Sequence, residues 1–216
     1  MKKIFIIGIS LFLIFNTSFA FEDGDWQSWP RISIEGKLSA KWKIYLDEEF
    51  RMGDNISDLY FHRSDFGVTY KFADCFYLGL NYWHSHKEKN GQWYQEKKPH
   101  INLTFKWEMG KFKLNDRNRF ENRYQQGKDK VWRYRNRLTL TPPLKFTKYN
   151  IQPYLADEIF FDFEESELNR NRIYAGIKIK LLKNLSFDGY YLLESNKKFE
   201  EWSAYNVMGS KFKVTF

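Results

Sequence analysis

Hydrophobic and polar residues alternate along most of this chain with a period of two. At the C-terminal end, Met208, Ser210, Phe212, Val214 and Phe216 fall on one face, and two lysines fall on the other. Successive side chains of a β-strand point to opposite faces, so the alternation predicts strands with one apolar and one polar face. An apolar outer face and a polar inner face are what a closed transmembrane barrel requires.

Turn-forming residues divide this pattern into ten predicted strands. Most are about 10 to 14 residues long, which suits a tilted strand that crosses a bilayer. The predicted strands are Lys41–Met52, Leu59–Phe72, Phe76–His86, Trp93–Trp107, Lys111–Gln125, Val131–Thr141, Ile151–Phe161, Leu168–Leu181, Leu185–Ser195 and Asn206–Phe216. The sequence therefore predicts an all-β fold, a single antiparallel transmembrane β-barrel of about 10 strands, over residues 41–216.

The connections between these strands fall into two alternating classes. The first class is tight at 73–75, 108–110 and 182–184 and longer at 142–150; the second is charged and longer, around Asn55, Lys89, Lys128, Glu165 and Lys198. Short periplasmic turns and longer outer loops are typical of outer-membrane barrels, so we expect Phe216 on the periplasmic side.

The beginning of the barrel allows two interpretations. Apolar positions from Ile32 to Leu46 keep one unbroken phase, which is too long for a single membrane pass. A two-residue hairpin at Ser39-Ala40 would reverse the faces and turn Trp42 inward. We therefore expect residues 21–40 to be an N-terminal periplasmic extension or a first-strand region, with twelve strands as the alternative count. Pro99 cannot donate a ladder hydrogen bond, and it predicts a bulge in its strand.

Residues 1–20 carry the pattern of a cleaved signal peptide. Lys2 and Lys3 form a basic start, 4–15 is almost entirely apolar, and small residues precede and occupy position Ala20. The apolar run of about a dozen residues is shorter than the roughly 20 needed for a transmembrane helix. We expect cleavage after Ala20 and localisation to the outer membrane of a Gram-negative bacterium.

Composition narrows the possible partners. The chain is 29% charged and 20% aromatic, with a net charge of +8; a barrel reconciles these values, since aromatics form interfacial girdles and charges fill the lumen. The positive charge suits outer-membrane lipid and lipopolysaccharide, and export excludes nucleic acid. Phe212, Val214 and Phe216 form the expected insertion signal for the outer-membrane assembly machinery. We expect a monomer without cofactor, and Cys75 has no second cysteine for a disulfide.

The polar face of the strands is crowded with long charged side chains. The expected lumen charge network consists of Arg117, Arg119, Glu121, Arg123, Arg133, Arg135, Arg137, Glu158, Arg170, Arg172 and Asp188. Such a network has two possible roles. It could be a structural set of ion pairs that fills a narrow barrel, or it could line a pore or ligand site that prefers anions. The sequence therefore favours a structural role or small-solute transport that leans towards anions, and it favours a non-enzymatic protein.

One constellation suggests an alternative function, an outer-membrane lipid hydrolase of the phospholipase or lipid A deacylase type. His62 and Ser64 share the outward phase near the outer end of their strand, and Glu48 on the preceding strand could orient the histidine. A serine beside a histidine that a carboxylate orients is the arrangement for attack on an ester. His84 and His86 point the same way, but without a third ligand they predict no metal site.

Several segments resemble those of one known family. They are WKIYLDEEFR at 42–51, RNRFENR at 117–123, Tyr134–Leu138, the stretch from Asn171-Arg172 to Gly176, and Tyr190-Tyr191. The chain resembles domain of unknown function 2490, whose members look like small outer-membrane barrels with no assigned activity. The resemblance covers most of the chain after the signal sequence; it implies location and fold and supplies no mechanism.

Overall fold

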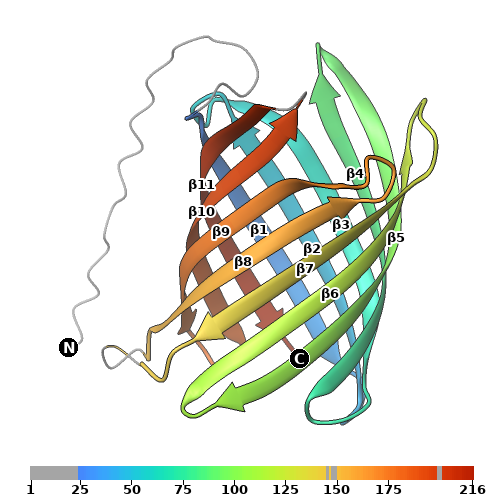
Figure 1. Cartoon of the computed structure of the whole chain (residues 1–216). Helices are drawn as coiled ribbons and strands as arrows, with labels where there is room; N and C mark the ends of the chain where they lie inside the picture. Colours follow the sequence, from blue (N-terminus) through green and yellow to red (C-terminus); the bar gives the residue numbers. More distant parts are fainter. Residues whose placement is uncertain (1–23, 145, 147–149, 199–200) are drawn as a thin grey trace.

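Eleven strongly tilted strands close into one barrel in the computed structural model, which describes residues 24–144, 146, 150–198 and 201–216 (Figure 1). The strands are β1 (Trp26–Lys37), β2 (Trp42–Gly53), β3 (Asp58–Lys71), β4 (Phe76–Lys89), β5 (Gln92–Met109), β6 (Phe112–Gln125), β7 (Val131–Thr141), β8 (Gln152–Asp162), β9 (Glu167–Lys180), β10 (Leu185–Lys198) and β11 (Glu201–Thr215). The predicted all-β barrel is confirmed, with a strand count between the ten preferred and the twelve kept as alternative. Among the described residues, no helix is long and apolar enough to cross a membrane.

The additional strand is β1, so residues 26–37 form a first strand of the barrel. Sequence reasoning considered only a two-residue turn, which would have inverted the faces of β2. The turn instead leaves three residues, 39–41, between Leu38 and Trp42, and the backbone N–H of Leu38 donates to the Trp42 carbonyl at 3.0 Å. An odd-numbered turn keeps residues of one parity on one face, so the unbroken apolar phase continues through two antiparallel strands. The predicted signal peptide, 1–20, lies outside the described residues.

Barrel closure differs from the expected antiparallel pattern at one seam. β1 pairs with β11 in parallel, from Trp26 opposite Asn206 to Glu35 opposite Thr215, whereas the other neighbouring pairs are antiparallel. The seam continues to the last residue, because the Phe216 N–H donates to the Glu35 carbonyl at 2.9 Å. Neither β1 nor β11 therefore exposes an unpaired backbone edge along the seam, as a strand in lipid requires.

Two local expectations about the strands were wrong. The connection at Lys89 is not a long loop: β4 and β5 continue to a two-residue turn at Asn90-Gly91, where both residues have positive φ. That conformation is the tight hairpin turn for which Asn-Gly is the preferred sequence. Pro99 also causes no bulge, since β5 keeps one register on both sides of it; the register shifts lie at Arg51/Met52 and Phe160/Phe161.

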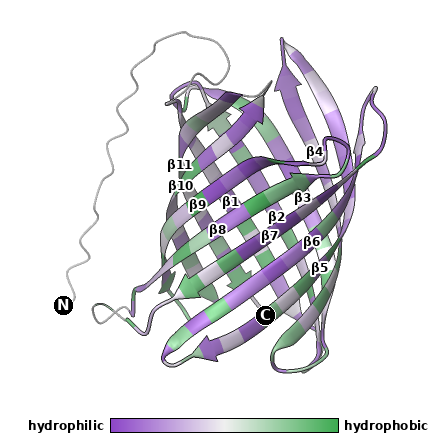
Figure 2. Cartoon of the chain, viewed as in Figure 1, coloured by the Kyte–Doolittle hydropathy of each residue, from purple (hydrophilic) through white to green (hydrophobic). Residues whose placement is uncertain are grey.

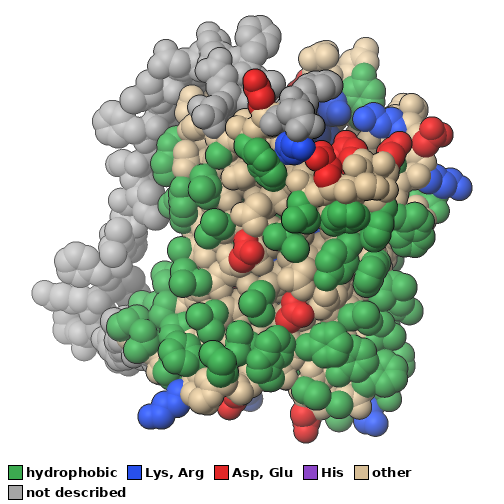
Figure 3. All heavy atoms as spheres, in the orientation of Figure 1, with side chains coloured by type: hydrophobic (Ala, Val, Ile, Leu, Met, Phe, Trp, Pro, Cys, Tyr) green, Lys and Arg blue, Asp and Glu red, His purple; other side chains and the backbone are tan. Residues whose placement is uncertain are grey.

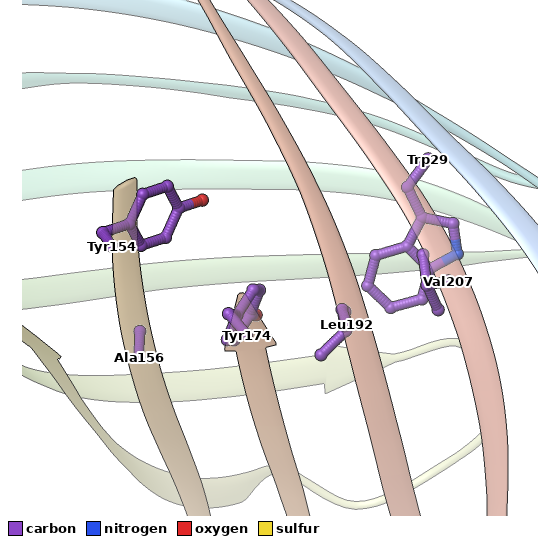
Figure 4. Packing of buried hydrophobic residues seen from close by; sticks show 6 residues of the cluster. All are labelled: Trp29, Tyr154, Ala156, Tyr174, Leu192 and Val207. Atoms are coloured by element: carbon purple, nitrogen blue, oxygen red, sulfur yellow. The ribbon is translucent and has the colours of Figure 1, made fainter. Parts of the chain in front are cut away.

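The outer wall is apolar and the lumen is filled. Exposed large hydrophobic side chains cover the outside, for example Ile32, Ile44, Phe66, Leu80 and Ile101, each more than 40% exposed. Figures 2 and 3 show the alternation along the strands and the apolar side chains that dominate the visible wall. Inside, a cluster of apolar side chains from β1 and β8–β11 packs together; its members are Trp29, Tyr154, Ala156, Tyr174, Leu192 and Val207 (Figure 4).

Glycines make room for large rings in this part of the lumen. The ladder places Tyr154, Gly176, Tyr190, Gly209 and Trp29 side by side across five neighbouring strands. A Cβ on Gly176 would lie 2.6 Å from the Tyr154 ring, and a Cβ on Gly209 would lie 2.0 Å from Cζ of Tyr190. The alternation of large and small residues thus lets the rings lie across the inner wall, and we call these five residues the ring row.

Candidate functional site

Ion pairs between buried groups fill the middle of the lumen. Glu121 is fully buried and accepts from Arg133 at 2.5 Å and from Arg135 at 2.8 Å. Glu158 accepts from Arg117 at 2.7 Å and from Arg135 at 2.8 Å. Because Arg135 joins both carboxylates, the two form one network across β6, β7 and β8.

A second network lies on the opposite wall, around β2. Asp47 and Glu49 of β2 both accept from Arg63, at 3.0 and 2.9 Å. Arg31 and Lys211 also bind Asp47, at 2.7 and 2.9 Å. The inward parity of β1 brings Arg31 to this network, so the residue escaped notice when β1 was not recognised as a barrel strand.

A chain of neutral polar groups connects the two walls. Tyr45 donates to Asp65 at 3.1 Å, and Asn81 donates to the Tyr45 hydroxyl at 2.6 Å. Asn102 then donates to Asn81 at 2.6 Å and accepts from Arg119 at 2.8 Å. These contacts run around the inner wall from β2 to β6 and connect the two ion-pair networks.

Three carboxylates in this region face seven guanidinium groups. The carboxylates are Glu121, Glu158 and Glu194, and the guanidinium groups belong to Arg117, Arg119, Arg133, Arg135, Arg137, Arg170 and Arg172. Arg137 stacks over Tyr174 at 4.0 Å, and it has no carboxylate partner among the described residues. The Nε atoms of Arg117, Arg135 and Arg137 are buried and lack a hydrogen-bond acceptor within the described part of the chain. The region therefore carries an excess of positive charge.

A cavity of about 440 Å³ opens above these pairs, at the end of the barrel opposite Phe216. We call it the vestibule. Eleven of its lining residues are lysine or arginine, and two, Glu96 and Glu165, are acidic. The carboxylates that pair with the deeper arginines, such as Glu121 and Glu194, are fully buried and lie outside this lining. A ligand in the vestibule would therefore meet mainly cations.

Aromatic rings hold many of these cations in place. The guanidinium carbons of Arg133, Arg135, Arg170 and Arg172 all lie between 4.4 and 5.4 Å from the centre of the Phe160 ring. A cation over the face of an aromatic ring is attracted by the ring's quadrupole. The ring and the ion pairs with Glu121, Glu158 and Glu194 together fix the positions of these guanidinium groups.

The opposite mouth of the barrel is also cationic. A second cavity of about 590 Å³ is lined by Lys178, Lys180, Lys183, Lys211 and Lys213, with Asp188 as its acidic residue. Asp188 accepts from the Tyr154 hydroxyl at 2.8 Å. Both mouths thus favour anions, with the ion-pair networks between them.

Three predicted residues of the hydrolase constellation lie together on the outer wall. Glu48 Oε2 accepts from Ser64 at 2.9 Å and lies 3.0 Å from His62 Nε2, whose ring stacks on Phe50. Ser64 thus donates to the carboxylate rather than to a histidine. His84 stands directly opposite Ser64 on β4. Within the described chain, no group of three or more His, Cys, Asp or Glu residues is arranged to hold a metal ion.

A polar cluster interrupts the apolar wall on β6 and β7, and sequence reasoning missed it. Asp116 accepts from Asn118 at 2.9 Å and from Asn136 at 2.5 Å, and Tyr134 donates to Asn118 at 2.5 Å. These groups share the outward parity of Phe120 and Leu138. Because these groups bond to one another, the cluster keeps its polar atoms paired on a mainly apolar wall, as Asn171 and Asp157 do on β9 and β8 at 2.7 Å.

The residues predicted to form the insertion signal lie on the outward face of the last strand. Phe212 is 45% exposed, and Phe216 is 73% exposed just beyond β11. Phe212 also packs against Phe187 of β10, with ring centres 5.0 Å apart. The structure thus places two aromatic side chains on the outer wall near the rim that holds the C-terminus.

Comparison with known proteins gives a family and one structural likeness. No curated protein matches the chain. The anion-selective porin from Comamonas acidovorans is a similar solved structure, with 12% sequence identity and a TM-score of 0.41 over 81% of this chain and 54% of that one. The chain spans about half the length of that porin. A family model described as "Protein of unknown function (DUF2490)" matches residues 26–205, and the chain belongs to this family.

Proposed function

We propose that this protein is an integral outer-membrane barrel that admits small anions from its vestibule and restricts their passage through a largely occluded lumen. The observation that carries the proposal is the vestibule lining, in which eleven cationic residues stand against two acidic ones. A cleft lined by one sign of charge, with low-dielectric walls, concentrates counter-ions of the opposite sign.

The outer wall supports the membrane location. Its exposed side chains include Trp42 and Trp107 towards the rim of the C-terminus and Trp93, Trp132 and Trp202 towards the other rim. Aromatic girdles at both interfaces with an apolar band between them are typical of outer-membrane barrels. In this orientation the vestibule faces the outside of the cell and Phe216 faces the periplasm.

The lumen supports low conductance. An eight-stranded barrel is just filled by its own side chains, and eleven strands add limited width. Here the added width is taken up by arginine pairs, the Tyr45–Asn81–Asn102 chain and the ring row. To pass, an anion has to take over guanidinium hydrogen bonds that a carboxylate now accepts. We expect this rearrangement to lower the ion current and to leave the preference for anions unchanged.

The test is the reversal potential of the purified barrel in a planar lipid bilayer under a potassium chloride gradient. We expect small single-channel currents with anion preference. Replacement of the rim lysines Lys89 and Lys128 by glutamate should shift the reversal potential towards cation preference, because both line the vestibule. Lys97→Glu, on the outer wall, is the matched control and should leave it unchanged.

Two outcomes would contradict the proposed transport. One is a large, stable, cation-selective channel, which is incompatible with the inward arginines. The other is a chloride flux into barrel-containing liposomes no greater than that into empty liposomes. Each would leave the barrel fold intact and reject the anion pathway.

A second candidate function is lipid hydrolysis on the outer wall, favoured by the contacts of Glu48 with both Ser64 and His62. We expect any such activity to depend on Ser64 and His62, because a serine nucleophile needs a neighbouring base. The assay is mass spectrometry of acyl chains released from phospholipid or lipopolysaccharide by the purified barrel. Release that persists in Ser64→Ala, or no release under varied calcium and detergent, would reject this candidate.

A further inference from the structure

We propose that the vestibule is a binding site for a multivalent oxyanion, a small molecule with two or more phosphate or carboxylate groups. The inference deepens the proposed function and rests on the same anion-attracting lumen. It names the class of molecule that the vestibule selects.

The first argument is the position of the charges relative to the cavity. Arg133, Arg135, Arg170 and Arg172 surround one ring, Phe160, and all four line the vestibule. Since each guanidinium carbon lies within 5.4 Å of the same ring centre, one small ligand can contact several of them. A monovalent ion would contact fewer of them at once.

The second argument is the pairing of these cations. Arg170 and Arg172 share Glu194, at 3.3 and 2.5 Å, and Arg133 and Arg135 share Glu121. Arg135 and Arg172 also contact Glu158, at 2.8 and 3.7 Å, so these four guanidinium groups share three carboxylates and positive charge is left in excess. Burial of a charge without full pairing is costly. An oxyanion that accepts from these donors supplies the missing negative charge.

The third argument is the chemistry and size of the site. The planar guanidinium fork matches the oxygens of phosphate and carboxylate and binds them through two parallel hydrogen bonds. On the opposite wall, Lys98 lies over the Trp83 ring at 4.2 Å and pairs with Glu96 at 2.8 Å, and Lys87 lies over the Tyr60 ring at 5.8 Å and adds a cation to the lining. The volume of about 440 Å³ is within the range of small-molecule pockets. The vestibule therefore suits a compact polyanion rather than chloride.

The experiment is isothermal titration calorimetry of the full-length purified barrel in a neutral detergent, with sodium pyrophosphate and sodium citrate as probes at matched ionic strength. Pyrophosphate tests phosphate groups and citrate tests carboxylate groups. We expect saturable binding of one equivalent of at least one probe, and a Kd that rises with added salt. Arg170→Gln should weaken binding about tenfold or more, because a hydrogen bond to a charged group is lost.

Lys183→Gln is the matched control, because Lys183 lines the cavity at the opposite mouth; its Kd should stay within about twofold of the unmodified protein. If Arg170→Gln does not fold, Lys89→Gln with Lys128→Gln at the exposed rim takes its place. Absence of saturable binding for both probes, equal weakening by Lys183→Gln, or equal competition by chloride at the same ionic strength would overturn the proposal. Binding without conductance would reject transport alone, and conductance without binding would reject this site alone.

Discussion

Replacement of Glu121 by glutamine is expected to lower the free energy of unfolding by about 3 to 5 kcal/mol, the cost typical of breaking a buried ion pair by removal of one partner. The glutamine side chain has nearly the same shape, so the change removes charge rather than volume. Glu121 is completely buried and lies within ion-pair distance of Arg119, Arg133 and Arg135. Its neutralisation leaves these guanidinium groups facing one another around a neutral amide.

The measurement is urea unfolding of the refolded barrel in lipid vesicles, followed by the mobility shift of unheated samples on gels. Glu164→Gln is the control, since Glu164 is exposed in the turn after β8 and its carboxylate is not part of the network; a change within about 0.5 kcal/mol is expected there. Equal stability of Glu121→Gln and Glu164→Gln would show that the buried network does not support the fold.

Replacement of Gly209 by alanine is expected to destabilise the barrel by about 1 to 3 kcal/mol, the usual cost of overpacking. The added Cβ would lie 2.0 Å from Cζ of Tyr190, which has to move. Tyr190 itself stands between Gly176 and Gly209 in the ring row, with the Tyr174 ring 5.6 Å away. The same unfolding assay measures the effect.

Gly36→Ala is the matched control, because its Cβ would meet only the flexible Ile44 side chain, at 3.3 Å. A double-mutant cycle with Tyr190→Leu sharpens the test, since a shorter side chain removes the clash. The cost of Gly209→Ala should then fall in the Tyr190→Leu background. An unchanged cost would mean that the ring is not what the glycine accommodates.

The ten strands after β1 were predictable from sequence because a wall with an apolar outer face and a polar inner face gives a clear alternation with a period of two. Parity also places Arg117, Arg133 and Arg172 on the lumen side without knowledge of their partners. Alternation assigns the faces of one strand, but this assignment carries over to the next strand only when the length of the turn between them is known. The three-residue turn at 39–41 preserved the apolar phase and hid the boundary between β1 and β2.

The vestibule was not predictable in the same way. Some of its cations stack on rings of strands far apart in sequence; Arg172 of β9, for example, lies over Trp29 of β1 at 4.9 Å. That contact depends on the closure of the barrel, which needs long-range pairing. The polar cluster at Asp116 was missed for a related reason: its Asn136 lies on the next strand, and only the ladder shows that the carboxylate is satisfied.

The parallel seam between β1 and β11 has a topological consequence. Because the number of strands is odd, the start of β1 and the end of β11 lie at opposite rims, so reporters fused ahead of Trp26 and behind Phe216 would lie at opposite ends of the barrel. A circular permutant could not be closed by a tight turn, because its linker would have to run the full height of the wall. A barrel with an even number of antiparallel strands has both chain ends at the same rim and meets no such restriction. The odd strand number therefore limits circular permutation and terminal fusion of this chain.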